Sequence, residues 1–136
     1  MTTPEPSRPF LPVRIAVLTV SDTRVLSDDK SGAVLADRLT EAGHTLAARE
    51  IVKDDIGASA VKVSGWIADP AINVIITTGG TGFTGRDVTP DAIRPLFEKE
   101  IDGFSALFHA ISCQKIGTST IQSRACAGLA NETFVF

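Results

Sequence analysis

A glycine-rich segment in the middle of the chain carries the residues best suited to chemistry. It follows a short β-branched run, residues 74–76, and places three glycines within residues 79–82. Glycine lets backbone N–H groups approach a ligand without interference from a Cβ atom, which suits phosphate groups or another anion. Arg86 and Asp87 follow the loop, where a simple connection would need neither charge. An anionic ligand beside a carboxylate suggests a bound metal ion.

The same segment can also be interpreted as an ordinary turn, since glycine is common in turns. It is neither a Walker A sequence nor the dinucleotide pattern G-x-G-x-x-G. The residues after the loop predict a helix start, with Thr89 as N-cap, Pro90 at the first helical position and Asp91 in the first turn. A strand, a glycine loop and a helix start in this order are typical of the ligand side of an open α/β sheet.

The elements around this loop predict an α/β fold. Residues 13–20 are dense in β-branched side chains and predict a central strand buried on both faces, and residues 45–52 predict a second strand. The spacing of apolar residues predicts helices over 32–42 and 57–68. Ser31 is the predicted N-cap of the first helix, and Gly43 is the residue after its end. This alternation predicts a three-layer αβα sandwich with a mostly parallel sheet and helices on both faces.

Polar residues follow the predicted strands at the same edge of the sheet. Ser21 and Asp22 come after the first strand and Asp54 after the second, while Asp87 belongs to the loop after the third. The helix start at Ser31 would add backbone donors for an anion if it faces the ligand, although a plain surface cap explains it equally well.

The remaining segments are interpreted mainly as structural. Trp66 is expected in the core, and residues 90–98 are expected to be helical. A second helix is predicted after Gly103, with its apolar residues as core candidates. Residues 117–120 form a polar hinge, 121–127 a short helix and 133–136 a strand. The apolar residues of that second helix are Phe104, Leu107, Phe108 and Ile111.

Composition bounds the class of protein. With 136 residues and 43% apolar content, the chain is expected to form one domain over 13–136, preceded by a proline-rich flexible arm at 1–12. The net charge of −3 and the lack of a Lys or Arg run argue against nucleic acid or membrane as partner. The N-terminus lacks a signal peptide's apolar region, so a cytoplasmic location is expected. Cys113 and Cys126 are expected to be free, buried thiols.

Residues 77–92, TTGGTGFTGRDVTPDA, closely resemble the signature of the MoaB/MogA family of molybdenum cofactor biosynthesis proteins. Further segments agree in the same order: LTVSD at 18–22, SG at 31–32, IVKD at 51–54 and GTSTIQSRACAG at 117–128. The resemblance covers roughly residues 13–136 and is closer to the MoaB branch, because Lys53 stands where adenylylating relatives commonly have proline. The family normally continues past the last strand with a loop and a C-terminal helix, which residues up to 136 do not include.

The resemblance implies an α/β protein that forms a homotrimer or homohexamer and binds molybdopterin. In active members, Mg²⁺ and ATP support adenylylation of the molybdopterin phosphate with release of pyrophosphate. Asp54 and Asp87 match the two family aspartates needed for that reaction, so they are the predicted catalytic residues and metal ligands. For Arg86, an ion pair with a carboxylate is the alternative to a role in ligand binding. The predicted substrate- and nucleotide-binding residues are Ser21, Asp22, Ser31, Gly32, Thr78, Gly79, Gly80, Thr81, Gly82, Ser119 and Ser123.

Two other functions remain open at the level of sequence. One is a protein of the same fold that binds molybdopterin without turnover, and it predicts binding that is indifferent to ATP and Mg²⁺. The other is a domain related to competence-damage-like proteins that acts on a different nucleotide. Retention of Asp54 and Asp87 favours the adenylyltransferase.

Overall fold

The computed structural model describes residues 8–136, and its centre is a mixed six-stranded sheet with the order β2-β1-β3-β6-β5-β4. Four strands run parallel: β1 (Arg14–Val20), β2 (Thr45–Val52), β3 (Val74–Thr78) and β6 (Thr133–Val135). β5 (Gly128–Ala130) and β4 (Lys99–Glu100) add to β6 in antiparallel orientation. The mostly parallel α/β sheet predicted from the sequence is therefore confirmed.

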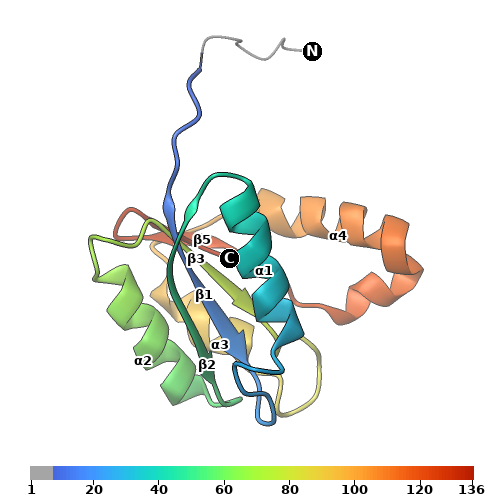
Figure 1. The fold of residues 1–136 in the computed structure, drawn as a ribbon. Coiled ribbons are helices and arrows are strands. Elements are labelled where there is room, and N and C mark those ends of the chain that lie inside the picture. Colours follow the sequence, from blue (N-terminus) through green and yellow to red (C-terminus); the bar gives the residue numbers. More distant parts are fainter. Residues whose placement is uncertain (1–7) are drawn as a thin grey trace.

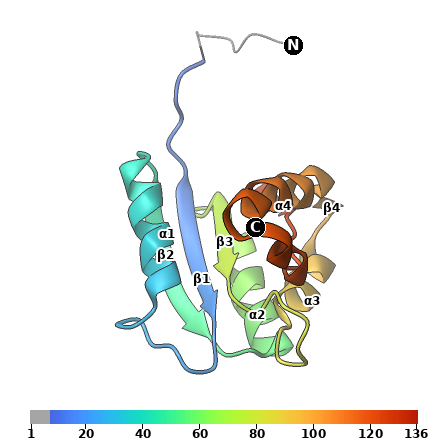
Figure 2. The same ribbon diagram turned by 90° about the vertical axis from the view of Figure 1, so that its right-hand side faces the viewer.

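Helices cover both faces of this sheet. α1 (Lys30–Glu41) lies on one face, and α2 (Ile56–Ile67) and α3 (Thr89–Ile93) lie on the other (Figures 1 and 2). α4 (Asp102–Ile116) extends away from the sheet, as the orange helix in Figure 1 shows. The 3₁₀ segments η1 (Arg94–Leu96) and η2 (Gly117–Gln122) follow α3 and α4. The predicted three-layer arrangement is confirmed.

β1 is the buried centre of the fold. Its residues from Ile15 to Val20 are all buried, because it lies between β2 and β3 and under helices on both sides. Leu18 faces a cluster with Val63 and Trp66 of α2, whereas Val17 packs toward Leu39 of α1. Alternate residues of one apolar strand thus supply both core layers, which explains its nearly continuous hydrophobic sequence. Trp66 is buried, as predicted.

Two predicted helix starts are wrong by a short distance. Asp29, not Ser31, caps α1, because its carboxylate accepts a hydrogen bond from the Gly32 N–H group. Val88, not Thr89, precedes α3, because the Thr89 hydroxyl donates to the Gly79 carbonyl and is not a cap. The positive φ of +94° at Gly43 after α1 agrees with its predicted place beyond the helix end.

Predictions for the C-terminal third need more correction. The helix expected over 90–98 ends at Ile93 and becomes 3₁₀, because Pro95 has no N–H group for a helical hydrogen bond. The short helix expected over 121–127 is absent from the described structure beyond Gln122. Arg124 instead donates its N–H group to the Thr81 carbonyl and so ties this segment to the glycine loop.

The apolar residues of α4 were expected in the core, and that prediction is wrong. No residue of α4 is buried in the described chain, and Leu107 and Ile111 are largely exposed. Phe104 is half-buried and contacts the ring of Phe136. Helical spacing reveals an apolar stripe but not whether another element covers it, and no element of residues 8–136 buries Leu107 or Ile111.

Three further expectations have mixed outcomes. Both cysteines are free, but only Cys126 is buried, while Cys113 lies exposed on α4. Residues 8–12 are exposed and outside regular secondary structure, and residues 1–7 of the predicted arm lie outside the described residues. Within 8–136, no helix combines the length and apolar character that crossing a membrane requires.

Candidate functional site

Three chain segments meet at the carboxyl edge of the parallel sheet. Asp22 follows β1, Asp54 follows β2, and the glycine loop follows β3, which lies on the other side of β1. The Asp54 N–H group donates to Asp22 Oδ1 at 3.1 Å, so the first two segments are joined directly. Parallel strand order therefore brings together the polar residues that the sequence places far apart.

The carbonyl groups of the glycine loop are all bound by the protein itself. Thr89 donates its hydroxyl to the Gly79 carbonyl at 2.8 Å and its N–H group to the Gly80 carbonyl at 3.0 Å. Arg124 donates its N–H group to the Thr81 carbonyl at 2.7 Å and Nε to the Gly82 carbonyl at 2.9 Å. Residues on both sides of the loop hold it in one conformation.

The N–H groups of this loop are used differently. Within residues 8–136, those of Gly80 and Thr81 have no hydrogen-bond partner. A run of N–H groups opposite satisfied carbonyls forms a concavity that favours an anion. The loop can therefore donate hydrogen bonds to a ligand without giving up any bond of its own.

Two glycines have a conformation that the loop requires. Gly79 has φ of +92°, and a Cβ atom there would overlap the carbonyl oxygen of Val20. Gly80 has φ of +68°, and its Cβ atom would overlap the Thr89 hydroxyl. Positive φ is costly for residues with a side chain, so this backbone can approach β1 and α3 only with glycine at both positions.

The carboxylates of Asp54 and Asp87 both lie against the glycine loop. A Cβ atom on Gly80 would lie 3.3 Å from Asp54 Oδ1, and one on Gly82 would lie 2.7 Å from Asp87 Oδ2. The two carboxylates thus lie directly against the backbone that presents the free N–H groups, which is where the sequence predicted a metal beside an anion.

The environments of these two carboxylates differ. Burial and then the negative charge of Asp87 raise the pKa of Asp54. The pKa of Asp87 is lowered, mainly because the Thr84 hydroxyl and N–H group donate to its Oδ2 at 2.7 and 3.0 Å. Asp87 is therefore held ionised in a fixed orientation. In the described part of the chain, neither carboxylate forms an ion pair with Lys or Arg.

This donor set fits a Mg²⁺ ion bound together with phosphate. Mg²⁺ prefers hard oxygen ligands and is commonly held by one or two carboxylates plus substrate phosphates and water. Asp54 and Asp87 supply that number. No group of three or more His, Cys, Asp or Glu side chains suited to a metal occurs in 8–136, so a two-carboxylate site would leave coordination positions for phosphate oxygens and water.

Asp22 and Ser21 organise the end of β1. Ser21 Oγ accepts hydrogen bonds from the N–H groups of Thr23 and Arg24 and so closes the turn after the strand. Asp22 accepts from the Asp54 N–H group through Oδ1 and forms an ion pair with Arg86 through Oδ2. The ion pair that the sequence left open for Arg86 is present, and its partner is Asp22.

The start of α1 contributes mainly through a buried network. Asp29 accepts hydrogen bonds from the Thr19 hydroxyl at 2.7 Å, the Gly32 N–H group at 3.1 Å and Arg49 Nη2 at 3.3 Å. Burial by itself raises the pKa of Asp29, but these hydrogen bonds lower it by more, so the net pKa shift is downward. The Gly32 N–H group is thus engaged within the protein, while Ser31 is exposed and faces the neighbouring groove.

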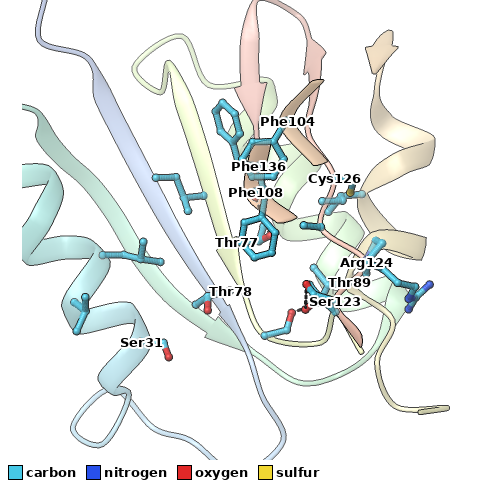
Figure 3. Close-up of a pocket in the computed structure, with 18 of the residues that line it drawn as sticks. Ser31, Thr77, Thr78, Thr89, Phe104, Phe108, Ser123, Arg124, Cys126 and Phe136 are labelled. Atoms are coloured by element: carbon cyan, nitrogen blue, oxygen red, sulfur yellow. Dashed lines mark hydrogen bonds between the residues drawn. The ribbon is translucent and has the colours of Figure 1, made fainter. Parts of the chain in front are cut away.

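That groove is a cavity of about 520 Å³ between α1 and α4, with β3 as its floor. Figure 3 shows Phe104, Phe108 and Phe136 grouped at one end, and Thr78, Thr89, Ser123 and Arg124 toward the glycine loop. Val34 and Leu35 of α1 line the opposite wall. An apolar compartment bordered by Gly79 and Thr81 of the glycine loop suits a ligand with a ring system and a charged group.

Most of the predicted site residues lie together in the structure, but Ser119 does not. Most converge on the loop and groove, and Ser123 Oγ reaches the Thr81 hydroxyl at 3.4 Å. Ser119 lies exposed in η2 and is outside the set of described residues that line the groove. Sequence reasoning did not single out Arg124 or the Thr89 hydroxyl as supports of the loop. The position of Arg124 next to Ser123 in the sequence was the one hint of its role. The sequence does not indicate its contact with the Gly82 carbonyl, which lies 42 residues away.

Comparison with known proteins agrees with this geometry. A family profile described as "Probable molybdopterin binding domain" matches residues 16–136. Molybdenum cofactor biosynthesis protein B of Escherichia coli K12 is 48% identical over 130 residues, which are 96% of this chain and 76% of that protein. A crystal structure of molybdenum cofactor biosynthesis protein B has 43% identity and a TM-score of 0.89, covering 93% of this chain and 79% of the other.

The two branches of the family differ in their similarity to this chain. A solved structure of MogA superposes with a TM-score of 0.81 over 90% of this chain and 81% of the other. Its sequence identity is only 22%, so it shares the fold, whereas the MoaB relatives share much of the sequence. The chain belongs to the molybdopterin-binding domain family of molybdenum cofactor biosynthesis proteins, on its MoaB side.

Proposed function

We propose that this chain binds molybdopterin and transfers an adenylyl group to it from Mg²⁺-ATP, giving adenylyl-molybdopterin and pyrophosphate. One observation carries the proposal: the carboxylates of Asp54 and Asp87 flank a glycine loop whose carbonyls are satisfied and whose N–H groups at Gly80 and Thr81 are free within the described chain. A metal-binding pair beside an anion-binding backbone is what the transfer of a phosphoryl-type group requires.

The proposed reaction joins two polyanions. A phosphate oxygen of molybdopterin attacks the α-phosphorus of ATP, and the bond from that phosphorus to the oxygen of the departing pyrophosphate breaks. Bound Mg²⁺ would neutralise the phosphate charge that increases as the bonds change. The chain's own part is positional: Asp54 and Asp87 hold the metal, and the loop N–H groups donate to phosphate oxygens and orient them.

The groove beside the loop supports a place for the pterin. Its apolar residues, among them Phe104 and Phe108, would contact a planar ring system, and Ser123 lies where the groove meets the loop. The family's description as a molybdopterin binding domain agrees with a ligand that has both a ring and a phosphate. A ring bound in the groove would bring the phosphate of the same molecule toward the glycine loop, of which Gly79 and Thr81 line the groove.

The test is to mix the purified protein with molybdopterin, Mg²⁺ and α-labelled ATP and to measure labelled adenylyl-molybdopterin. We expect product with the wild type and with Asp37→Asn, an exposed α1 aspartate away from the loop. Asp54→Asn and Asp87→Asn should each remove it while retaining the fold by circular dichroism. Molybdopterin binding without product, unaffected by ATP or Mg²⁺, would replace the transferase with a protein that only binds molybdopterin.

We also propose that the chain forms a homotrimer or homohexamer, as the family resemblance implies. The apolar surface of α4, including Leu107 and Ile111, is exposed in the single chain and supports association through such a surface. Sedimentation equilibrium gives the subunit number, and a monomer at micromolar concentration would refute this proposal.

A further inference from the structure

Asp22 occupies a position that the proposed reaction does not itself explain. It is not one of the two carboxylates that flank the glycine loop, yet it contacts both of the segments that carry them. Its Oδ1 accepts a hydrogen bond from the Asp54 N–H group at 3.1 Å, and its Oδ2 forms an ion pair with Arg86, the residue before Asp87. One side chain at the end of β1 therefore connects the end of β2 to the loop after β3.

The segments joined by Asp22 carry like charges that repel each other. Asp54 lies against Gly80 and Asp87 against Gly82, so without a cation between them the like charges of these neighbouring carboxylates repel. Thr84 fixes Asp87 within its own turn, and Arg124 binds the Asp87 carbonyl and the far side of the loop. Asp22 adds a link between the two segments, because it binds the Asp54 N–H group and Arg86 with the same carboxylate.

We infer that Asp22, through Arg86 and the Asp54 backbone, is a positioning residue that holds Asp54 and Asp87 at the separation required for metal binding. The inference rests on the proposed function, since it assumes a divalent cation between these carboxylates. Neither Asp22 nor Arg86 is assigned as a metal ligand. Asp22 acts on the backbone of one ligand residue and on the neighbour of the other.

Replacing Arg86 shows whether this residue affects cation affinity by positioning the ligands or by its own charge. Removing a positive charge near a cation site should by Coulomb's law alone strengthen cation binding. Loss of a positioning contact should weaken it, and the removal of groups that orient metal ligands commonly costs about tenfold or more in metal affinity. The two explanations therefore predict opposite directions for Arg86→Ala. Its side chain is 73% exposed, so the substitution should leave folding intact.

The experiment measures binding of Mn²⁺, as a spectroscopically visible substitute for Mg²⁺, to the full chain by electron paramagnetic resonance. We expect saturable binding that Asp54→Asn removes, and about tenfold weaker binding in Arg86→Ala. Arg94→Ala is the matched control, because it also removes an exposed arginine from an ion pair, with Glu100, and should bind as the wild type does. Tighter or unchanged binding in Arg86→Ala overturns the positioning role.

A double-mutant cycle tests whether the two residues act as one unit. In the Asp22→Asn background, Arg86→Ala should cause no further loss of affinity, whereas equal losses in both backgrounds would show independent effects and refute the pair. Asp22→Asn retains an oxygen acceptor for the Asp54 N–H group, while Asp22→Ala does not. Amide hydrogen exchange of Asp54 in the metal-free protein should therefore be faster in Asp22→Ala only.

These outcomes keep the inference separate from the function on which it rests. Mn²⁺ binding that depends on Asp54 but not on Arg86 would leave the metal site in place and remove the positioning role. If the wild type binds no Mn²⁺, or if Asp54→Asn binds it as well as the wild type does, both the metal site and the positioning role are refuted.

Discussion

Substitution of Gly79 by alanine should destabilise the fold because this glycine closes against the central strand. Its φ is +92°, and an added Cβ atom would overlap the carbonyl oxygen of Val20. The obstacle is backbone of the buried strand β1, which also forms the core layers on both sides. Neither partner can rotate away, unlike a clash with the end of a flexible side chain.

The expected cost follows from two contributions. A residue with a side chain at strongly positive φ costs about 1–3 kcal/mol. Inserting a methyl group into a packed backbone contact costs about another 1–3 kcal/mol. Together they give about 2–6 kcal/mol, a large part of the roughly 5–15 kcal/mol that stabilises a domain. At about 4 °C per kcal/mol for a chain of this size, the melting temperature should fall by about 8 °C or more.

Thermal unfolding followed by circular dichroism measures this effect, and Gly85→Ala is the matched control from the same loop. Gly85 has no positive φ and nothing within 4 Å of an added Cβ atom, so alanine there should change stability by less than about 1 kcal/mol. A Gly79→Ala protein that melts at the wild-type temperature would refute the argument that the loop requires glycine for its closure against Val20.

Three further substitutions test the loop and its surroundings. Gly82→Ala should weaken Mn²⁺ binding in the electron paramagnetic resonance titration, because its Cβ atom would lie 2.7 Å from Asp87 Oδ2 and displace that carboxylate. Arg124→Ala should lower the free energy of unfolding by about 2 kcal/mol in urea titrations, since it loses its hydrogen bonds to loop carbonyls. Asp29→Asn should be less stable than wild type at neutral pH. The difference should shrink as pH falls below 3.8, since the folded-state pKa of Asp29 is lowered and its contribution is lost on protonation.

Patterns within one strand or one loop were sufficient to predict much of this fold. The apolar run that forms β1 and the glycine loop after β3 are properties of contiguous residues, and the bounds of β2 agree with the predicted 45–52. β4 and β5 were missed because they have two and three residues, too few to show a periodicity. Their pairing depends on the position of β6, which sequence spacing does not reveal.

The candidate site was predictable in its residue types but not in its supports. The strand pattern placed Asp54 and Asp87 near one edge of the sheet, and the family resemblance supplied their predicted role as metal ligands. The hydrogen bonds of Thr89 and Arg124 to the loop carbonyls join residues up to 42 positions apart, and no local pattern indicates them. The exposure of α4 was unpredictable for a related reason, since an apolar stripe does not show what covers it.

The electrostatics of the loop explain why a cation and a polyanion should bind together in the proposed reaction. A polyanion alone would gain hydrogen bonds from Gly80 and Thr81 but would face the negative charges of Asp54 and Asp87. A cation alone would relieve the repulsion between the carboxylates but would leave these N–H groups without an acceptor. Only the pair satisfies both halves of the site, so each partner should raise the affinity for the other by the same factor. The proposed site should therefore favour Mg²⁺ together with phosphate over either component alone.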